Sequence, residues 1–294
     1  MKTKILSVLF CLLFLFAADP VSAGWQQCWR YTENNTVVRS AWRQLDGSWY
    51  YFNADGIMHT GWVFSGGKWY YCGEDGKMDT GWLTLNDGVY LLDQSGAMIS
   101  GCTVTLDGGS YRFDTSGRAV PLDENAFFSE PFSSLSFEQK LSLLRKVFPD
   151  GSYWNCTSAE MRTLPVGVTD IPCAHHTEDS MFCRIYNGKT AEFLQVPECY
   201  QCLGFANLVS DFLFGKDSEV KAFLNYKNLR PGDHVRLTKD QHSFIVLEKT
   251  DDYVTVVECN GDYGTCRIRW DRKVSAEQLK TKGEVFFLRR TAKQ

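Results

Sequence analysis

One cysteine and one histidine in the C-terminal half have the residue types and the surroundings that nucleophilic catalysis needs. Cys202 opens an apolar-periodic segment that predicts a helix. The unsatisfied N–H groups and the dipole at a helix start favour a thiolate over a thiol. His242 lies near the start of an expected strand, where a neutral imidazole can take the proton from that thiol. Cys202 and His242 are therefore the predicted nucleophile and base.

Two further side chains could orient that imidazole. Glu258 and Asn260 are two positions apart, so on a strand both point to the same face. Either can accept the imidazole N–H and fix its tautomer, the role that the third member of such a triad performs. The structural alternative is that Glu258 only pairs with an arginine, such as Arg267 or Arg289.

A helix followed by a series of strands must position these groups. After the cysteine helix, Gly215 ends the apolar pattern, and five β-branched-rich segments follow. The expected strands are 234–238, 241–249, 253–259, 265–270 and 284–289. Earlier, Ser136 caps another expected helix, with Gln139 in capping-box position. Residues 136–294 therefore predict one α+β domain, with a helix-borne cysteine packed on an antiparallel sheet.

The order of these motifs resembles the CHAP peptidoglycan amidase and endopeptidase domains, which are relatives of NlpC/P60 within the papain-like fold. It consists of helix-initial Gln201-Cys202, then Pro-Gly-Asp, then the strand histidine, then Glu-x-Asn sixteen residues later. The resemblance implies that Cys202 is the nucleophile, that His242 is the base and that Glu258 and Asn260 orient it. It also implies that Gln201 helps to stabilise the oxyanion.

The chain departs from the CHAP pattern immediately before the base. The family usually has glycine there, whereas this chain has Gln241. His234, at the start of the preceding strand, is therefore the reserve candidate for the base.

The N-terminal half is built from repeats. Trp42, Trp62 and Trp82 recur every 20 residues, and each unit contains an aromatic cluster and a closing glycine. Each unit predicts two short strands, and one such hairpin cannot bury its own aromatic face. Residues 24–120 are therefore expected to stack as an all-β solenoid of hairpins.

The repeats resemble the choline-binding and glucan-binding repeats of Gram-positive surface proteins over residues 29–120. The resemblance implies a partner that is a cell-wall polymer, either choline-bearing teichoic acid or glucan, held on exposed rings. The expected ligand-binding residues are Trp49, Tyr51, Trp62, Trp69, Tyr71 and Trp82. The alternative for any single ring is that it only fills the solenoid core.

The N-terminus and the charge balance restrict the cellular location of the protein and the class of its partners. Residues 1–23 have two lysines, an apolar run and Val21-Ser22-Ala23 at the expected cleavage site, as a secretory signal peptide does. Without Lys2, Lys4 and Asp19, the 31 basic and 35 acidic residues become 29 and 34, a net charge of −5. We therefore expect a secreted, cell-wall-associated protein with no membrane span in the mature chain and no nucleic-acid partner. Residues 121–135, rich in Pro and Ser, are expected to be a linker.

Ten cysteines remain after the signal, and they allow two other chemistries. Cys199 and Cys202 form a Cys-x-x-Cys motif at a helix start, as thiol oxidoreductases do. Thiol oxidoreductases carry this motif within a βαβ pattern, and the sequence does not predict that pattern around Cys199 and Cys202. Cys156, Cys173, His175, His176 and Cys183 supply donors for zinc, but without paired Cys-x-x-Cys spacing they favour disulfides or thiols. We expect no metal and no cofactor.

Together these observations predict a secreted cell-wall hydrolase that cleaves a peptidoglycan amide, as an N-acetylmuramoyl-L-alanine amidase or an endopeptidase. The aromatic repeats would hold it on its substrate. The first alternative is a non-catalytic surface-binding protein or adhesin. The second is a Cys-x-x-Cys thiol oxidoreductase.

Overall fold

The structure is a computed structural model that describes residues 29–173, 182–261, 264–280 and 284–291. The predicted signal peptide, residues 1–23, lies outside these residues. The chain divides into two compact units. The first takes the chain up to Leu83 together with Tyr90–Ile99, and the second takes Thr84–Val89 together with the chain from Ser100 onward.

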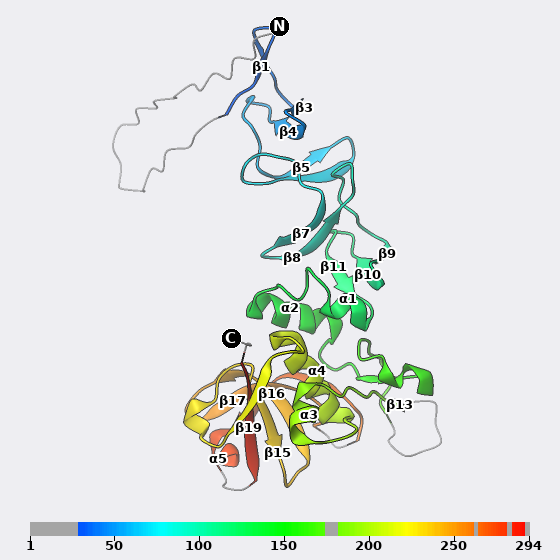
Figure 1. Cartoon of the computed structure of the whole chain (residues 1–294), viewed down its shortest axis with the longest axis vertical. Helices are drawn as coiled ribbons and strands as arrows, with labels where there is room; N and C mark the ends of the chain where they lie inside the picture. The colour runs from blue at the N-terminus through cyan, green and yellow to red at the C-terminus, as the bar shows by residue number, and fades with distance from the viewer. Residues whose placement is uncertain (1–28, 174–181, 262–263, 281–283, 292–294) are drawn as a thin grey trace, which may run out of the picture. The chain divides into compact units, whose positions relative to one another are not determined.

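Short antiparallel hairpins build the first unit (Figure 1). Their strands are β1 (Thr32–Glu33), β2 (Thr36–Val37), β3 (Ala41–Leu45), β4 (Ser48–Phe52), β5 (Gly61–Ser65), β6 (Lys68–Cys72), β7 (Gly81–Leu85) and β8 (Gly88–Leu92). The turn between β3 and β4 has positive φ at both Asp46 and Gly47, as the tight turn of a twisted hairpin requires. The prediction of two strands in each 20-residue unit is confirmed.

Each hairpin is joined to its neighbour by the same contacts. One backbone hydrogen bond recurs every 20 residues, from Met58 N–H to Trp29 O at 2.7 Å, and at 2.8 Å from Met78 to Trp49 and from Met98 to Trp69. Gly76 has φ +78°, and a Cβ there would lie 2.3 Å from the Met58 sulfur, so only glycine lets the methionine pack. The period thus specifies the stacking of the hairpins as well as the hairpins themselves.

The second unit begins with a small sheet and two helices. Its three-stranded sheet has the order β11-β10-β9. The elements before the cysteine helix are β9 (Thr103–Leu106), β10 (Gly109–Phe113), β11 (Ala119–Pro121), α1 (Glu124–Phe128), α2 (Phe137–Val147), β12 (Asn155–Cys156), the 3-10 turn η1 (Ala159–Thr163), β13 (Phe182–Cys183) and α3 (Lys189–Leu194). Ser136 and Gln139 form the predicted capping box at the start of α2.

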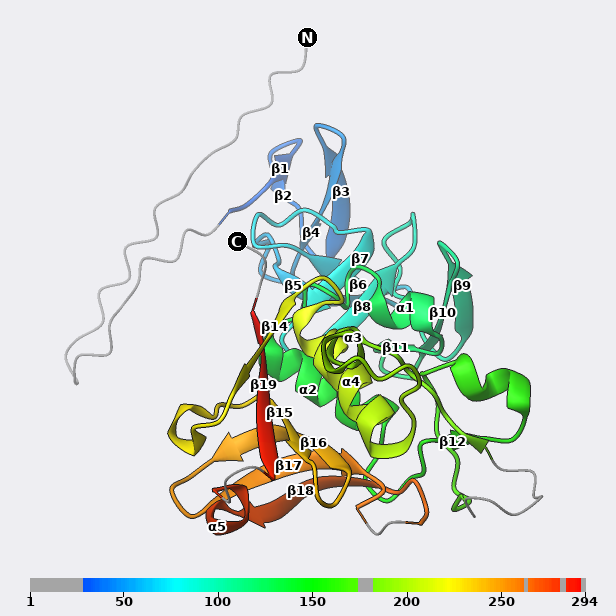
Figure 2. The ribbon, with the colours of Figure 1, turned by 60° about the horizontal axis from the view of Figure 1, so that its bottom comes forward.

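A six-stranded antiparallel sheet with the order β14-β19-β15-β16-β17-β18 forms the centre of the second unit. Helix α4 (Gln201–Phe214) packs on β16 and β17 (Figure 2). The other elements are β14 (Glu219–Phe223), the 3-10 turn η2 (Tyr226–Asn228), β15 (His234–Leu237), β16 (His242–Lys249), β17 (Tyr253–Cys259), β18 (Ile268–Ser275), α5 (Ala276–Leu279) and β19 (Val285–Thr291). A helix-borne cysteine beside an antiparallel sheet is therefore present.

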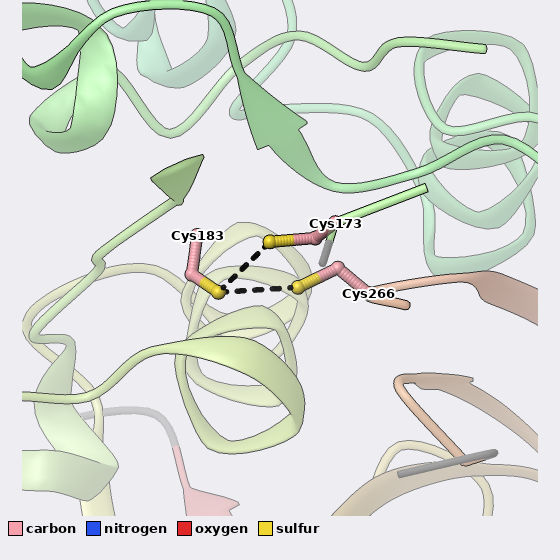
Figure 3. A group of neighbouring side chains, drawn as sticks. All are labelled: Cys173, Cys183 and Cys266. Carbon is pink, nitrogen blue, oxygen red and sulfur yellow. Dashed lines mark hydrogen bonds between the residues drawn. The ribbon is translucent and has the colours of Figure 1, made fainter. Parts of the chain in front are cut away.

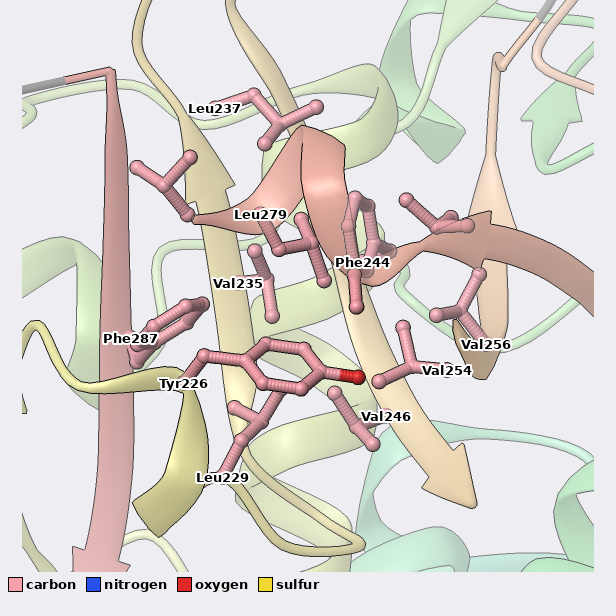
Figure 4. Close-up of a cluster of buried hydrophobic side chains, with 13 residues drawn as sticks. Tyr226, Leu229, Val235, Leu237, Phe244, Val246, Val254, Val256, Leu279 and Phe287 are labelled. Carbon is pink, nitrogen blue, oxygen red and sulfur yellow. The ribbon is translucent and has the colours of Figure 1, made fainter. Parts of the chain in front are cut away.

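An apolar cluster gives this sheet its core (Figure 4). Val235, Phe244, Val256 and Phe287 come from four different strands, and each is fully buried. Tyr226 from η2 and Leu279 from α5 close the same cluster. Because the strands that carry His242 and Glu258 also carry this cluster, the core fixes the strand register on which the candidate site depends.

The predicted linker is wrong. Residues 121–135 contain helix α1, capped by Asp123, and they bury Phe127 and Phe132 completely. Phe127 stacks on Phe212 of α4 with ring centroids 4.1 Å apart. Proline and serine made the segment resemble a linker, but its phenylalanines anchor it to the second unit. The last repeat hairpin, β9–β10, also belongs to that unit, so the predicted boundary at 120 does not separate the two units.

The strand predictions hold for β15, β16, β17 and β19 to within two residues at each end. The segment predicted at 265–270 is instead β18, from Ile268 to Ser275, and edge strand β14 was not predicted. Mixed charged and apolar residues at 219–223 conceal the alternation that marks a strand. Among the described residues, no helix has the length and apolarity needed to cross a bilayer.

Candidate functional site

Cys202 lies in the first turn of α4, where its thiol meets the beginning of β16. Its sulfur lies 3.5 Å from the carbonyl oxygen of Gln241 and hydrogen bonds to His242. The Ser243 backbone N–H also donates to it. The thiol is 7% exposed. The sequence thus brings the predicted nucleophile and the predicted base into direct contact.

His242 and Glu258 face each other because of the strand register. Phe244 pairs with Glu258 across β16 and β17, and His242, two residues before Phe244, lies on the same face. The imidazole Nε2 lies 2.7 Å from a Glu258 carboxylate oxygen. Since Nε2 serves the carboxylate, Nδ1 is the nitrogen that remains for Cys202. Glu258 and Asn260 were both predicted to orient the imidazole, and it is Glu258 that makes this hydrogen bond.

Arg272 holds the Glu258 carboxylate, and the sequence did not suggest it. Its Nη2 donates to one carboxylate oxygen at 2.7 Å, and its Nε lies 2.5 Å from the other. The predicted alternatives were Arg267 and Arg289, but Arg289 pairs with Asp233. Across β17 and β18 the pairing shifts between Val256 and Glu258, so counting residues along the chain does not lead to Arg272.

The charges of these groups are coupled. Burial alone would raise the pKa of the Cys202 thiol, but the hydrogen bond and charge of His242, the Ser243 N–H and the charge of Arg236 together lower it. Burial opposes the charged form of His242 too, yet its contacts with Cys202 and Glu258 raise its pKa to about 9. The pKa of the fully buried Glu258 is lowered, because its contacts with His242 and Arg272 outweigh burial. The arrangement therefore favours a thiolate–imidazolium pair next to an ionised carboxylate.

Gln201 and Asn260 form a second hydrogen-bonded pair beside the nucleophile. The Asn260 amide donates to Gln201 Oε1 at 3.0 Å, and Asn260 Oδ1 accepts from the backbone N–H groups of Thr265 and Cys266. Gln201 Nε2 points to the Cys183 sulfur, 3.9 Å away. The predicted oxyanion residue is thus tied to a group of cysteines on its other side.

Several residues of the site have left-handed backbone conformations. Gln201, Gln241, Asn260 and Cys266 have φ between 50° and 63°. Non-glycine residues adopt this region at a cost of order 1–3 kcal/mol, which surrounding contacts must offset. Gln241 does so with hydrogen bonds from Arg236 to its carbonyl and side-chain oxygens, at 2.7 Å each. The residue before His242 therefore has a backbone conformation that glycine adopts most easily, although the residue here is glutamine.

His234 and Cys199, the alternatives to His242 and Cys202, lie outside this group of contacts. His234 pairs with Ile245, which puts it on the opposite face of the sheet from His242. Burial lowers the pKa of His234 to about 3, so it stays neutral. Cys199, the other cysteine of the Cys-x-x-Cys motif, belongs to a small apolar cluster with Ala191 and Leu203, and burial raises its pKa. His175 and His176, considered as zinc ligands, lie outside the described residues.

In the repeats, aromatic rings meet in recurring triads. Trp62 packs against Tyr71 of its own hairpin at 5.2 Å and against Tyr90 of the next hairpin at 5.0 Å, both edge to face. The same spacings put Trp42 5.1 Å from Tyr51 and 5.2 Å from Tyr70. Each triad joins neighbouring hairpins and presents ring faces at one junction.

Four of the predicted ligand residues belong to or border these triads. Tyr51, Trp62 and Tyr71 are members, and the exposed Trp69 packs on Trp62 at 6.4 Å. Trp49 is 41% exposed. Tyr71 lies nine residues after Trp62, whereas the residue nine positions after Trp82 is Leu91. Trp42, Tyr70 and Tyr90 were not among the ligand residues predicted from the sequence. In each triad the two tyrosines lie 9 and 28 residues after the tryptophan, and a search for these spacings would have identified the triads.

Two known repeat families match the repeat region. Residues 38–79 match the choline-binding repeat, and residues 80–98 match a cell wall binding repeat. This region of the chain thus consists of repeats of the choline-binding type. No curated protein matches the chain.

Similar solved structures include CbpJ from Streptococcus pneumoniae (33% identity over 32% of this chain and 32% of that chain, TM-score 0.29). They also include the modular autolysin LytC from the same organism (29% identity, 32% and 22%, TM-score 0.28). A third is the modular Cpl-1 endolysin complexed with a peptidoglycan analogue (33% identity, 32% and 29%, TM-score 0.28). The chain spans less than a third of the length of each.

Proposed function

We propose that this chain is a cell-wall hydrolase that binds a choline-bearing wall polymer through its repeats and cleaves a peptidoglycan amide with Cys202. The observation that carries the catalytic part is the contact series from Cys202 through His242 to the buried, Arg272-held Glu258. Structural cysteines have raised thiol pKa values, and a nucleophile needs a lowered one. Here the pKa of Cys202 is lowered despite burial.

Each group then has one chemical task. The Cys202 thiolate attacks the amide carbonyl carbon, and the N–H groups at the start of α4 face the oxyanion that forms. The imidazolium of His242 gives its proton to the leaving amine as the C–N bond breaks, which leaves a thioester. His242, now neutral, takes a proton from water, and the resulting hydroxide attacks the thioester, which releases the carboxylic acid, ionised in solvent, and restores the thiolate–imidazolium pair. Glu258 keeps the imidazole oriented throughout.

The repeats have the chemistry to recognise a quaternary ammonium. Two junctions carry a tryptophan whose ring centroid lies 5.0–5.2 Å from the centroids of two tyrosines. Electron-rich ring faces attract such a cation without requiring an N–H donor, which a quaternary ammonium lacks. The match of residues 38–98 to choline-binding and wall-binding repeats supports choline over glucan as the ligand.

Clearing of suspended cell walls tests the catalytic part. The wild-type protein should lower the turbidity under reducing conditions, and Cys202→Ala should be slower by about 10³-fold or more, because nothing replaces the nucleophile. Both proteins should sediment with walls equally. Mass spectrometry of the released fragments then identifies the bond: a free lactyl carboxylate marks an amidase, and a cut stem peptide or cross-bridge marks an endopeptidase.

A purely binding role is the second candidate, because every family match lies in the repeats. It predicts that wild type and Cys202→Ala sediment with walls and that neither clears them. Equal clearing by both proteins would equally contradict Cys202 as the nucleophile.

A further inference from the structure

Three cysteines that the proposed hydrolysis does not use come together beside the candidate active site (Figure 3). Cys183, at the end of β13, lies 3.4 Å from Cys173 and 3.5 Å from Cys266, measured between sulfurs. All three sulfurs lie within 4.8 Å of one another. Cys266 lies 83 residues after Cys183 in the sequence, so only the fold brings it to the other two.

These distances do not fit disulfide bonds. A disulfide holds its sulfurs about 2.05 Å apart and joins only two of them. Cys183 approaches two partners at almost the same distance, so a bond to either would leave the third thiol against it. Three sulfurs around one point are instead what a soft metal ion collects. Tetrahedral zinc with bonds of about 2.3 Å to sulfur separates its thiolates by roughly 3.8 Å, close to the separations here.

The surroundings also suit thiolates. The Gln201 amide points to the Cys183 sulfur at 3.9 Å, and side-chain N–H donors of this kind commonly orient and stabilise metal-bound thiolates. Arg184 directly follows Cys183 and is 3% exposed. In the described part of the chain, its hydrogen bonds go to the carbonyl oxygens of Asn155, Met161 and Leu164. Three thiolates around a divalent ion carry one net negative charge, and Arg184 is a buried positive residue next to Cys183 in the sequence.

We propose that Cys173, Cys183 and Cys266 are three ligands of a structural zinc ion that fastens Cys173 and the end of β13 to the residues just before β18. Zinc is the metal that best matches thiolate ligands in tetrahedral geometry. This reverses our expectation from the sequence, which favoured disulfides or thiols because the paired Cys-x-x-Cys spacing is missing.

The site would also position the residues next to the nucleophile. Asn260 accepts hydrogen bonds from the backbone of Thr265 and Cys266, and it donates to Gln201. Gln201 in turn donates to Cys183. Fixing Cys183 and Cys266 on one ion therefore fixes both ends of the hydrogen-bonded chain that holds Gln201 beside Cys202.

Metal analysis of the purified full-length protein tests this proposal without any measurement of hydrolysis. About one zinc per chain is expected in the wild type. Cys183→Ser removes the sulfur that contacts both others, so its zinc content should fall to near zero. Cys102→Ser, which changes an exposed cysteine outside the cluster, should keep the full content.

Cobalt substitution keeps the test informative if Cys183→Ser folds poorly. Wild-type protein stripped with a chelator and loaded with Co²⁺ should show strong thiolate-to-cobalt absorption and the visible bands of a tetrahedral ion, and added zinc should abolish both. Native wild-type protein that contains no zinc, or that contains copper in its place, would overturn the proposal. So would peptide mapping that finds Cys183 in a disulfide with Cys173 or Cys266.

Discussion

At Cys202, burial and hydrogen bonding act on the thiol in opposite directions, and the hydrogen bonds prevail. Two arginines contribute from outside the triad. Arg236 adds positive charge near the sulfur and donates a hydrogen bond to the Gln241 carbonyl, while Arg272 keeps Glu258 ionised. The lowered pKa of Cys202 and the charges coupled to it thus depend on residues of four neighbouring strands, β15 to β18, which a single motif around the cysteine does not contain.

The coupled charges predict a bell-shaped pH dependence of wall hydrolysis. The active pair needs a deprotonated Cys202, so activity rises as the pH passes the lowered pKa of that thiol. It also needs a protonated His242, so activity falls as the pH rises through about 9. Glu258→Gln removes a charge that raises the pKa of His242, so the alkaline limb should move to lower pH by roughly one to two units.

The initial rate of wall clearing from pH 5 to pH 11 measures both limbs. Glu219→Gln, which neutralises an exposed glutamate on edge strand β14, is the matched control and should leave the profile unchanged. If the alkaline limb of Glu258→Gln stays at the wild-type pH, Glu258 does not raise the pKa of His242, which contradicts the prediction.

At the scale of elements, the segment that includes α1 is a structural part of the second unit. Phe127→Ala removes a fully buried ring that stacks on Phe212, and it should lower the free energy of unfolding by about 3–5 kcal/mol. Leu122→Ala, at an exposed position of the same segment, should change it by less than about 0.5 kcal/mol. Denaturant titration of both variants measures the difference; equal values would mean that the segment contributes no packing.

The hairpin junctions predict where choline binds. Trp62→Ala removes the ring shared by Tyr71 and Tyr90, and a lost cation–π contact of about 2 kcal/mol should weaken that site roughly 30-fold. Trp82→Ala is the matched control, since Leu91 replaces the tyrosine there, and it should cause a much smaller loss. Calorimetric titration with choline distinguishes the two; a larger loss for Trp82→Ala would contradict the triads as sites.

How much the sequence revealed depends on how far apart the interacting residues are. The 20-residue period sufficed for the hairpins, and the order of Cys202, His242 and Glu258 sufficed to find groups that are in contact. Arg272 was missed because a shift in strand pairing separates it from any simple spacing. The sequence offered Cys173 and Cys183 as zinc donors, but Cys266 was missed because it lies 83 residues after Cys183. Phe127 was missed because isolated phenylalanines in a Pro- and Ser-rich segment have no periodicity.

At the scale of the whole molecule, the two proposed activities should be linked through local concentration. Repeats bound to the wall keep the hydrolytic unit near its substrate, which raises its effective concentration without changing its chemistry. Free choline in excess should therefore slow the clearing of intact walls by about 10-fold or more. It should leave the hydrolysis of soluble peptidoglycan fragments unchanged.

Parallel assays on walls and on soluble fragments, with choline and with equimolar ammonium chloride as the control for ionic strength, measure this link. Inhibition of both reactions by choline would indicate that choline acts on the hydrolytic site itself. Inhibition of neither would contradict the role of the repeats in targeting.

The hydrogen bonds from Met58, Met78 and Met98 to the tryptophans of the preceding hairpins have a consequence for how such chains evolve. Each hairpin depends on its immediate neighbour through contacts that are the same at every junction. Duplication or deletion of one 20-residue segment within a gene would therefore recreate the same junctions on both sides of the change. A single unequal crossover can thus add or remove a repeat, and natural selection can adjust wall affinity in whole steps while the second unit keeps its sequence.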